Sequence, residues 1–588
     1  MFSYFKPKLT WHLINCLLII TITCTLSNLT AQTWSSPQTT SINEPYLIHH
    51  DLFTNREGHH IVLSNSNATN SIKYNLINSA GTLVRSSTIE SSEAGEFPCV
   101  SGNDNYIFVV YKIGNLIKAK FSDDIGVTWE PIPHTINAGY NQCTGIDIKY
   151  QDSSGLHLVF AMKDAGGGYS ETYYYKLNDD FSDWIYYKNV TDETDMVGGY
   201  PTIDVSPNRV HVSFNSGQGN IPGNSGPART RDKYLGNWED SQIVTAGVDN
   251  LSAREKVCVN NSTLYDFYYL HVSGMGQFHN DLYYKTRDLS STQWSNPVFL
   301  ESWVNVTSFM GAVTTADNNT HIIYLADGDI KHRSSVNWSN ENLISDDFPY
   351  YTNLVLSSVS NDVYTFWKPL YNNQMVYAKL DVAPLTPSNF AISTHYTGDD
   401  SHPKLSWSSS KEPDVFNQNT AIVIERRLSP GGRDFSELTR LNGSATEFID
   451  YNISYAGSGT LSATYRIKTK DLANNYSPYS DSKTIYYGDA WKIGTKQNQG
   501  SYGYSLKQNY PNPFNPVTQI GYSVKENVFV NLKVFDALGN EVALLVNEYK
   551  DPGYYEVNFD ASNLSSGIYF CQILAGNYHS ISKMIYLR

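Results

Sequence analysis

Residues 107–131 read IFVVYKIGNLIKAKFSDDIGVTWEP. The segment holds an apolar run at 108–111, a second run at 116–119, a polar turn and then Trp129. Short aromatic and β-branched runs that are separated by Gly, Asn and Asp are typical of strands joined by tight turns. The segment therefore predicts three neighbouring strands, the last of which begins at the tryptophan.

The same unit recurs along the first two-thirds of the chain. Its apolar centre occurs seven times, ending at residues 63, 111, 160, 214, 270, 324 and 366, so successive units are 42 to 56 residues apart. A tryptophan follows in five units, at Trp129, Trp184, Trp238, Trp294 and Trp338. Repeats of this length are typical of propeller blades. The pattern predicts an all-β chain in which residues 32–383 form a seven-bladed β-propeller, with a six-bladed ring as the alternative.

The last unit lacks a strand that begins with Trp, and the N-terminal region supplies one. TWSSP at 33–37 closely matches QWSNP at 293–297. A ring that closes in this way leaves no sheet edge free to pair with another chain. We therefore expect the segment around Trp34 to complete the final sheet.

One turn carries a family resemblance. SDDIGVTW at 122–129 fits the pattern S-x-D-x-G-x-T-W and resembles the Asp-box of sialidase-like (BNR) repeat propellers. In such a turn Asp caps backbone donors, Gly accepts an unusual backbone angle and Trp packs between sheets. The resemblance implies a structural turn on the face away from any substrate, and it does not predict hydrolysis.

The composition changes after residue 383. LSW at 405–407, IVIE at 422–425 and YRIKTKD at 465–471 read as strands, and together they resemble a fibronectin type III domain over 384–488. Such a resemblance implies a spacer or a docking module built from two sheets. Residues 489–502 are polar and rich in Gly and Gln, which predicts a linker.

The final segment, 503–588, carries the most specific motifs. LKQNYPNPFNPVT at 506–518, VFDALGNEV at 534–542, DASNLSSGIYF at 560–570 and KMIYL at 583–587 occur in order. They closely resemble type A sorting domains of the type IX secretion system. The resemblance implies export through the periplasm to the cell surface or the medium, with the secretion machinery as partner.

The N-terminus and the overall composition agree with export. Lys6 and Lys8 precede an apolar stretch, and Ala31 offers a cleavage point, so residues 1–31 read as a signal peptide. No later apolar run reaches the length of a membrane span. The formal net charge of −15 disfavours a nucleic-acid partner.

Four cysteines remain beyond the signal peptide: Cys99, Cys143, Cys258 and Cys571. Their spacing matches no zinc or redox motif, and no motif for a cofactor or metal is present. We expect buried, unbridged side chains, with a Cys99–Cys143 disulfide as the alternative in an exported protein.

A cleft near the ring axis is the predicted site. The innermost strands and the loops at 163–171, 215–227 and 273–280 would meet on one face, and loops on a rigid scaffold commonly carry binding residues. The candidate ligand-binding residues are Asp164, Tyr169, Glu171, Tyr200, Arg254 and His279. The candidate catalytic residues are Glu44, Glu96, Tyr200, Arg254 and His279, in which the two glutamates could act as an acid/base pair.

These residues leave three functional hypotheses open. The first is a secreted or surface protein whose propeller binds glycans or surface partners without catalysis. The alternative is a polysaccharide hydrolase or lyase, in which His279 or Tyr200 acts as base beside Arg254. The third is a purely structural role in adhesion. True sialidases, as a family, bind the substrate carboxylate with three arginines and carry an Arg-Ile-Pro motif. This sequence has no Arg-Ile-Pro, and Arg287 falls near a turn that resembles the Asp-box, on the face opposite the predicted cleft, so a true sialidase is not expected.

Overall fold

In the computed structural model, residues 34–587 are described except for 66–71, 92–94, 138–141, 164–169, 192–196, 218–227, 235–236, 241, 245–254, 275–276, 306–309, 347–348, 350–353, 398–399, 430–431, 433, 455–460, 488–491, 494–503, 510 and 551–552. Within these residues every regular element is a strand, apart from the short helix α2 (Pro413–Phe416). The predicted all-β class is confirmed. The predicted signal peptide and most of the predicted linker lie outside the described residues.

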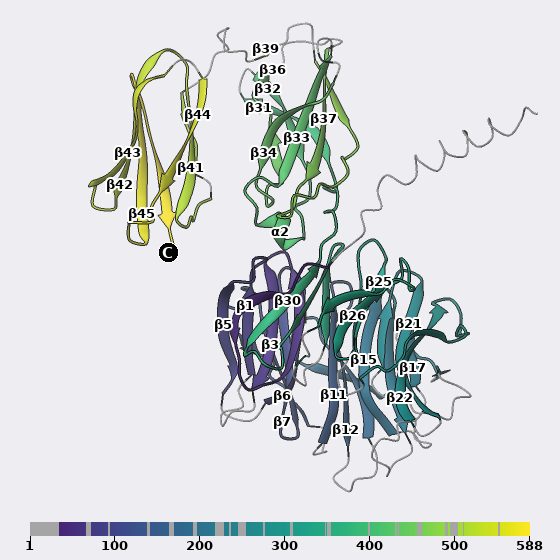
Figure 1. The fold of residues 1–588 in the computed structure, drawn as a ribbon. Coiled ribbons are helices and arrows are strands. Elements are labelled where there is room, and N and C mark those ends of the chain that lie inside the picture. The colour runs from purple at the N-terminus through teal and green to yellow at the C-terminus, as the bar shows by residue number, and fades with distance from the viewer. Residues whose placement is uncertain are drawn as a thin grey trace, which may run out of the picture.

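Residues 38–380 form antiparallel sheets that follow one another along the chain (Figure 1). Three of them are β2 (Leu47–Asn55), β3 (Gly58–Asn65), β4 (Ile72–Ile77) and β5 (Leu83–Glu90); β6 (Gly95–Gly102), β7 (Ile107–Ile113), β8 (Leu116–Ser122), β9 (Glu130–Pro131) and β10 (Ile136–Asn137); and β11 (Gln142–Gln151), β12 (Gly155–Lys163), β13 (Ser170–Leu177) and β14 (Trp184–Asn189).

Four more sheets complete this region. They are β15 (Val197–Ser206), β16 (Arg209–Gly217), β17 (Ala228–Tyr234), β18 (Asn237–Trp238) and β19 (Gln242–Ile243); β20 (Lys256–Val259), β21 (Thr263–Gly274), β22 (Gln277–Asp288) and β23 (Val298–Glu301); β24 (Gly311–Thr314), β25 (Thr320–Ala326), β26 (Asp329–Ser334) and β27 (Asn342–Ser345); and β28 (Val355–Val359), β29 (Asp362–Trp367), β30 (Gln374–Leu380) and β1 (Gln38–Asn43).

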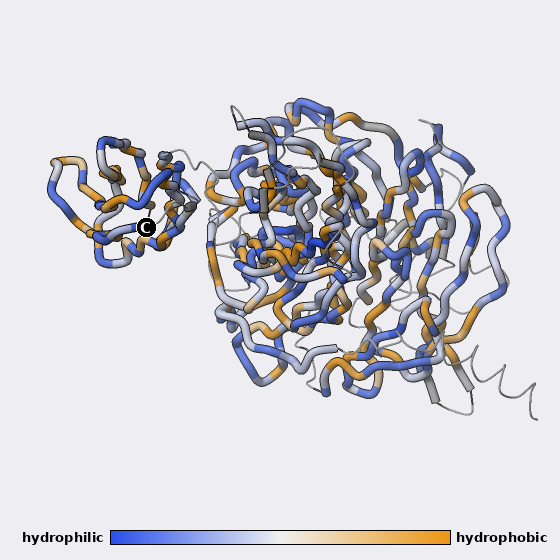
Figure 2. The backbone as a smooth tube through the Cα atoms, turned by 90° about the horizontal axis from the view of Figure 1, so that it is seen from above, coloured by the Kyte–Doolittle hydropathy of each residue, from blue (hydrophilic) through white to orange (hydrophobic). Residues whose placement is uncertain are grey.

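The innermost strands of these sheets contact one another in cyclic order: β2, β6, β11, β15, β20, β24, β28 and again β2. The sheets therefore stand around a common axis in a propeller-like ring. Viewed from above, apolar and polar segments are interspersed along the chain of this ring (Figure 2). Strands such as β7 and β25 are buried along their whole length, as expected where a sheet packs on both faces.

The ring closes between the two ends of its own sequence. Strand β1 pairs with β30, and Trp34 forms an isolated bridge with Leu380. The backbone N–H of Ser35 also donates to the carbonyl of Lys379 at 2.8 Å. The predicted closing role of the N-terminal segment is confirmed.

Tryptophans near the outer strands join neighbouring sheets. Each packs its ring on the third strand of the preceding sheet, with centroids 4.8–5.1 Å apart, in the pairs Trp129–Tyr74, Trp238–Tyr174, Trp338–Tyr284 and Trp34–His332. The last pair spans the closing junction. The same type of contact therefore joins sheets at the start, in the middle and at the closure of the ring.

The turn at 122–129 has the structural role predicted for it. Asp124 accepts hydrogen bonds from the backbone N–H groups of Val127 and Thr128 and from the Thr128 hydroxyl. The pKa of Asp124 is lowered to about 2. The largest cause is the hydrogen bond that the carboxylate accepts from the backbone N–H of Thr128. Gly126 has φ +77°, and its missing side chain leaves room for the Tyr74 ring.

The cysteines are unbridged. Cys99, Cys258 and Cys571 are buried, and Cys143 is partly exposed. Cys99 Sγ donates to the carbonyl oxygen of Ile146 at 3.2 Å, whereas Cys143 faces the carbonyl of Gly145. The expectation of separate, mostly buried thiols is confirmed, and the alternative Cys99–Cys143 disulfide does not form.

The second module consists of two sheets around one core. One sheet holds β31 (Ala391–Thr397), β32 (Asp400–Ser406) and β35 (Glu447–Ile449); the other holds β34 (Ser436–Leu441), β33 (Ile422–Ser429), β37 (Leu461–Thr469) and β38 (Lys483–Tyr487). Trp407, Ile424 and Tyr465 lie in the core between them. Strand β36 (Ile453–Ser454) pairs with β39 (Lys492–Ile493).

The C-terminal unit is also a pair of sheets. One sheet holds β40 (Ser505–Leu506), β41 (Val517–Val524) and β44 (Gly553–Asp560); the other holds β43 (Glu541–Lys550), β42 (Val528–Asp536), β45 (Gly567–Ala575) and β46 (Tyr578–Tyr586). Phe514, Val534 and Met584 contribute to its core.

The second module is attached to one face of the ring. We call this the turn face, because the turns after the innermost strands lie there; the opposite entry face is where the innermost strands begin. Lys379 Nζ lies 2.8 Å from Asp362, 2.5 Å from Asp381 and 2.6 Å from Asp414 of α2. Arg56 also stacks over Phe416. The module therefore contacts the ring at its turn face, opposite the entry face.

Substituting Gly126 tests the turn packing. We expect Gly126→Ala to lower the unfolding free energy of the ring by roughly 2–4 kcal/mol, because the new Cβ meets the Tyr74 ring and the positive φ is strained. Gly114→Ala is the matched control, since it has φ +53° and no neighbouring atom within 4 Å, and we expect a loss of about 1 kcal/mol. Equal losses in urea unfolding would contradict the packing role.

Candidate functional site

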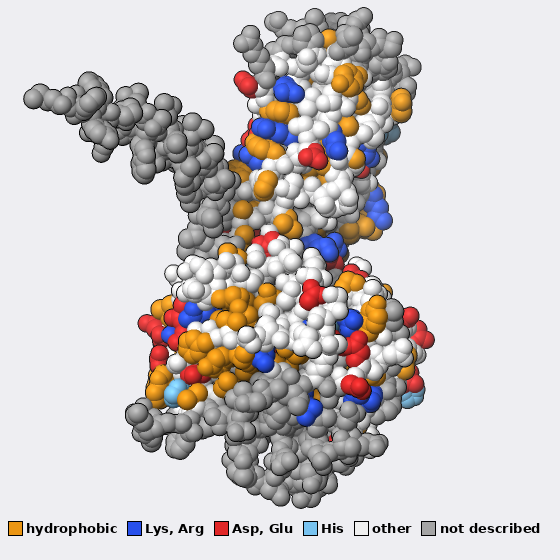
Figure 3. Space-filling model, turned by 90° about the vertical axis from the view of Figure 1, so that its right-hand side faces the viewer, with side chains coloured by type: hydrophobic (Ala, Val, Ile, Leu, Met, Phe, Trp, Pro, Cys, Tyr) orange, Lys and Arg blue, Asp and Glu red, His pale blue; other side chains and the backbone are white. Residues whose placement is uncertain are grey.

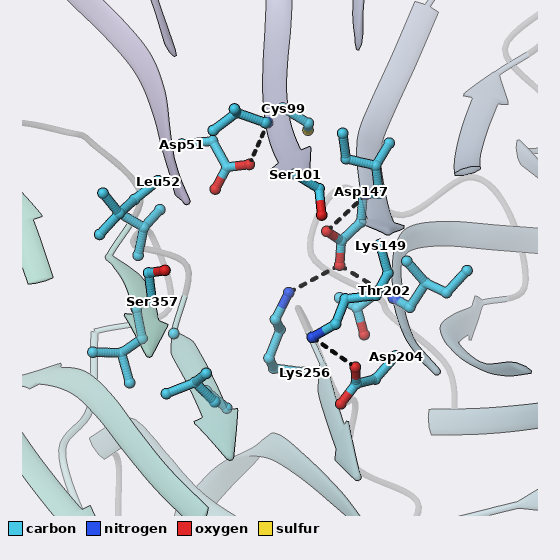
Figure 4. A pocket seen from close by; sticks show the side chains of 18 of the residues that line it. Asp51, Leu52, Cys99, Ser101, Asp147, Lys149, Thr202, Asp204, Lys256 and Ser357 are labelled. Atoms are coloured by element: carbon cyan, nitrogen blue, oxygen red, sulfur yellow. Dashed lines mark hydrogen bonds and ion pairs between the residues drawn. The ribbon is translucent and has the colours of Figure 1, made fainter. Parts of the chain in front are cut away.

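The innermost strands surround a cavity of about 260 Å³ (Figure 4). All seven of these strands line it, with residues in the ranges 51–53, 97–102, 145–150, 200–204, 255–258, 310–313 and 354–358. The lining residues come from the innermost strand of every sheet, so the cavity lies on the axis of the ring. The cavity is therefore the axial channel of the ring.

Polar side chains on the wall connect each sheet to the next. Asp51 accepts the backbone N–H of Val100 at 2.9 Å, and Asp204 accepts that of Val259 at 2.8 Å. Asp147 does the same for Ile203 at 3.1 Å. The donor in each case is 49 to 56 residues further on, so these bonds repeat with the sheets. Their first role is to hold neighbouring innermost strands together.

Two ion pairs cross the channel. Lys256 Nζ lies 2.9 Å from Asp147, two sheets away, and Lys149 Nζ lies 2.9 Å from Asp204 on the adjacent sheet. Burial by itself would lower the pKa of Lys256, but the neighbouring carboxylates, Asp147 first, raise it above its usual value. Both lysines are therefore charged and fixed at neutral pH.

Asp51 differs from the other two wall aspartates. Burial raises its pKa to about 6, and the charge of Asp147 adds to the effect against the opposing bond from Val100. A carboxyl with such a pKa takes up a proton just below neutral pH. The channel therefore has one titratable acid beside two fixed ion pairs.

Two aromatic residues stand at the entry to the channel with unusual backbone geometry. Phe97 and Tyr200 each have φ +50° and each precede a proline. The strand register shifts at both places, between Glu96 and Cys99 and between Gly199 and Thr202. Bulges of this kind re-aim side chains and are enriched beside functional sites. They present an aromatic rim at the channel mouth.

A third aromatic residue lies further out on the entry face. Trp303 has φ +61° and is 50% exposed, and its ring stacks on His279 with centroids 4.4 Å apart. His279 Nε2 lies 3.2 Å from Asp281 Oδ1. The stack therefore combines an exposed indole face with a histidine that lies beside a carboxylate.

The predicted carboxylates of the entry face are engaged in ion pairs or hydrogen bonds. Glu44 accepts bonds from Lys73 and Asn65, at 2.9 and 2.8 Å. Glu96 pairs with Lys112 at 2.7 Å. The Tyr173 hydroxyl donates to Glu171. Each of these carboxylates has a local partner that holds its side chain.

Of the predicted site residues, Tyr200 lines the channel and His279 lies in the Trp303 stack. Asp164, Tyr169 and Arg254 lie outside the described residues. The predicted loop at 273–280 is wrong, because β21 continues to Gly274 and β22 begins at Gln277. Cross-strand pairing extends the hairpin there in place of an open loop. Arg287 is on the turn side, where it pairs with buried Asp232.

The wall aspartates were missed from the sequence, although they carry a signal. Asp51, Asp147 and Asp204 each stand within the innermost strand of a repeat, in the triplets HDL, IDI and IDV. A charged residue at the same point of three repeats indicates a shared partner. Lys256 has no comparable signal, because its partner lies two sheets away.

One group of described carboxylates could in principle hold a metal ion: Asp362, Asp381 and Asp414. The Lys379 ammonium lies within 2.8 Å of all three and supplies the positive charge. Burial raises the pKa of the adjacent Glu412 to about 9, and Asp362 and Asp414 reinforce it. The cluster joins ring and module through a lysine, and it does not argue for a metal.

In the C-terminal unit the two ends of the motif series meet. Asn512 accepts the backbone N–H of Ile585 at 2.7 Å, and Phe514 stacks on Tyr586 in the core. Residues 508–587 match the family described as the secretion system C-terminal sorting domain. This part of the chain is a sorting domain. It indicates export to the cell surface or the extracellular space, as predicted, and makes the secretion machinery a partner.

No curated protein matches the chain. Among solved structures, an α-L-arabinanase of Penicillium chrysogenum is 14% identical, with a TM-score of 0.36 over 49% of this chain and 93% of the other. An α-L-arabinofuranosidase of Fusarium graminearum is 9% identical, with a TM-score of 0.36 over 59% and 97%. A polysaccharide lyase is 10% identical, with a TM-score of 0.39 over 61% and 94%. Similarity this distant assigns no activity.

Among the described residues, no helix has the length and apolarity that crossing a membrane requires.

Substitution of two wall aspartates should change stability in opposite directions. Because the folded-state pKa of Asp51 lies above its ordinary value, folding takes up a proton and stability falls as pH rises from about 4 to 6. Asp51→Asn should therefore raise the unfolding free energy at pH 7.5 by on the order of 1 kcal/mol, and the gain should vanish near pH 4.

Asp147→Asn is the matched comparison. It leaves Lys256 without its partner, so we expect a loss of roughly 1–3 kcal/mol at pH 7.5. Urea unfolding of both variants across pH 4–8 measures the two effects. If Asp51→Asn instead lowers the unfolding free energy at pH 7.5, the ionised Asp51 carboxylate does not destabilise the fold and the assignment is contradicted.

Proposed function

We propose that residues 32–383 are a seven-bladed propeller that binds a glycan or a glycan-bearing surface partner on its entry face, without catalysis. The proposal rests most on the half-exposed Trp303, whose backbone has a positive φ and whose ring stacks on His279. An exposed, rigidly held indole costs little side-chain entropy to bury and suits the apolar face of a sugar ring. Export by the sorting domain brings this face into contact with extracellular polymers.

The aromatic rim at the channel mouth supports the same conclusion. Phe97 and Tyr200 are presented by bulges, while Glu44 and Glu96 are paired with lysines. A retaining or inverting pair of catalytic carboxyls needs both groups aimed at one bond. Carboxylates held by separate lysines on different sheets suit a binding surface better than an acid/base pair.

The domain order suits a presenting role. We propose that residues 384–488 are a fibronectin type III-like spacer and that 489–502 link it to the sorting domain at 503–588. The module covers the turn face through Lys379 and Arg56, so the opposite face points away from the rest of the chain. In this arrangement the turn at 122–129 belongs to a BNR-like repeat and has no part in binding.

The second candidate function is that of a polysaccharide hydrolase or lyase that acts in a cleft on the same entry face. One observation favours it: Asp281 lies 3.2 Å from His279, as an orienting carboxylate does beside a general base. In that case His279 would take a proton from a sugar bound on Trp303. Arg254 would have to supply the positive charge.

Binding to a panel of polysaccharides tests the proposal with residues 32–588. We expect affinity electrophoresis to detect at least one neutral or acidic polysaccharide, and Trp303→Ala to weaken its binding by about tenfold through lost stacking. Tyr396→Ala, an exposed tyrosine of the second module, is the matched control and should have no effect.

Assays for new reducing ends and for unsaturated products run in parallel. Turnover of any polysaccharide that His279→Gln abolishes would replace the binding proposal with the enzymatic one. If binding of a neutral polysaccharide is unchanged in Trp303→Ala, the entry face is removed from the proposal.

A further inference from the structure

The second module carries a row of alternating cations and aromatic rings on the outer face of its larger sheet. The order is Arg427, Phe435, Arg466, Tyr479, Lys468, Tyr476 and Lys470, which we call the cation–aromatic row. Each cation lies 3.6–5.9 Å from the centroid of the next ring. In Figure 3 basic and apolar side chains alternate along one edge of this module.

The local sequence explains how the row forms. Arg466 and Lys468 alternate with the core residues Tyr465 and Ile467 on β37, so both cations point outward. Alternate residues of a strand stand about 6.6 Å apart, which is enough for one ring to enter between two cations. Lys470 continues the spacing beyond the strand and forms a bridge with Tyr476.

Two serines place the tyrosines between these cations. Ser477 Oγ accepts the N–H of Thr469 at 2.9 Å, and Ser480 Oγ accepts the N–H of Ile467 at 3.0 Å. Their own backbone N–H groups donate to the carbonyls of the same two residues. The segment YSPYS at 476–480 is therefore fixed along the edge of β37, with both tyrosines turned outward.

One carboxylate of the chain itself, that of Glu425, is bound within the row. Glu425 accepts bonds from Arg466 at 2.6 and 2.8 Å and from the Tyr479 hydroxyl at 2.6 Å. A guanidinium together with a phenol hydroxyl thus forms one complete carboxylate site. Within the described residues, no carboxylate lies within 4.0 Å of the charged groups of Arg427, Lys468 or Lys470.

We propose that the cation–aromatic row is a docking surface for a linear polysaccharide that carries carboxylates, a polyuronate. Three cations with no described carboxylate at ion-pair distance are held against aromatic rings along one face of the sheet, which suits a polymer with repeated negative charges. Tyr486, 70% exposed, lies opposite Ser462 on this outer face and offers an aromatic surface for the sugar rings. The chain carries a net charge of −15, so a local row of positive charge is needed to hold an anionic polymer.

This docking surface is independent of the entry face. Trp303→Ala should therefore leave polyuronate binding to the row unchanged, and failure of one proposal does not decide the other. Cations held by stacking lose little rotamer freedom on binding, which favours a modest but real affinity at low salt.

The test uses residues 32–588 with polygalacturonate as probe and the neutral glucan pullulan as reference. We expect polygalacturonate to bind at low salt and pullulan not to bind. The double variant Arg427→Gln/Lys468→Gln should weaken binding by about tenfold or more. Lys404→Gln, on the outer face of the other sheet, removes one positive charge, half of the change in the double variant, at a lysine that is paired with Glu447; it should stay within about twofold of the unchanged chain.

Two further measurements separate a loss of charge from a loss of folding. Lys468→Arg keeps the charge and the ring contacts, so it should retain binding. In the unchanged chain, polygalacturonate should protect Lys468 and Lys470, but not Lys404, from acetylation detected by mass spectrometry, which needs no folded variant.

Three results would overturn the proposal. The first is that polygalacturonate does not bind. The second is that Lys404→Gln weakens polygalacturonate binding as much as Arg427→Gln/Lys468→Gln does. The third is that poly-glutamate binds as tightly as polygalacturonate, which would indicate a protein partner.

Discussion

Each sheet of the ring has two faces to cover, and its neighbours are the only elements that can cover them. Trp129 on Tyr74 and Trp34 on His332 show how this constraint is met: an indole from one sheet fills the space over the third strand of the sheet before it. Burial of a tryptophan removes up to about 250 Å² from water, so each such contact is a major stabilising term. The last of these contacts joins the two ends of the ring sequence and so stabilises the closed ring.

The inner wall meets a different demand, since strands converge there and leave little room for large side chains. Short acceptors such as Asp147 and Asp204 reach the backbone of the next strand and replace bulk with hydrogen bonds. An unpaired buried carboxylate would be costly, and Lys256 and Lys149 provide the counter-charges. Asp51, which has no lysine at ion-pair distance among the described residues, has a raised pKa as a consequence of its position.

Most of the fold could be predicted because the sequence repeats the same unit. Features that depend on contacts between residues far apart in the sequence could not be predicted. The apolar runs, the turn around Asp124 and the closing strand all depend on neighbours in sequence or on a copied unit, so one chain sufficed. The aromatic mouth depends on bulges at Phe97 and Tyr200, whose only signal is an aromatic residue before a proline. The contacts of Lys379 with Asp414 join two domains, and no local pattern indicates them.

The distribution of positive charge connects the architecture with the two proposed binding surfaces. In the ring, Lys73, Lys112, Lys149 and Lys256 are each paired with a carboxylate of another part of the ring, so they serve the fold. In the second module, Lys468 and Lys470 face aromatic rings instead, and a ring attracts a cation without neutralising its charge. The row therefore keeps positive charge available to an anionic polymer, while the ring offers aromatic surface on its entry face. Because the module occupies the turn face, the two surfaces do not compete for the same side of the ring, and one polymer could contact both only by passing around its rim.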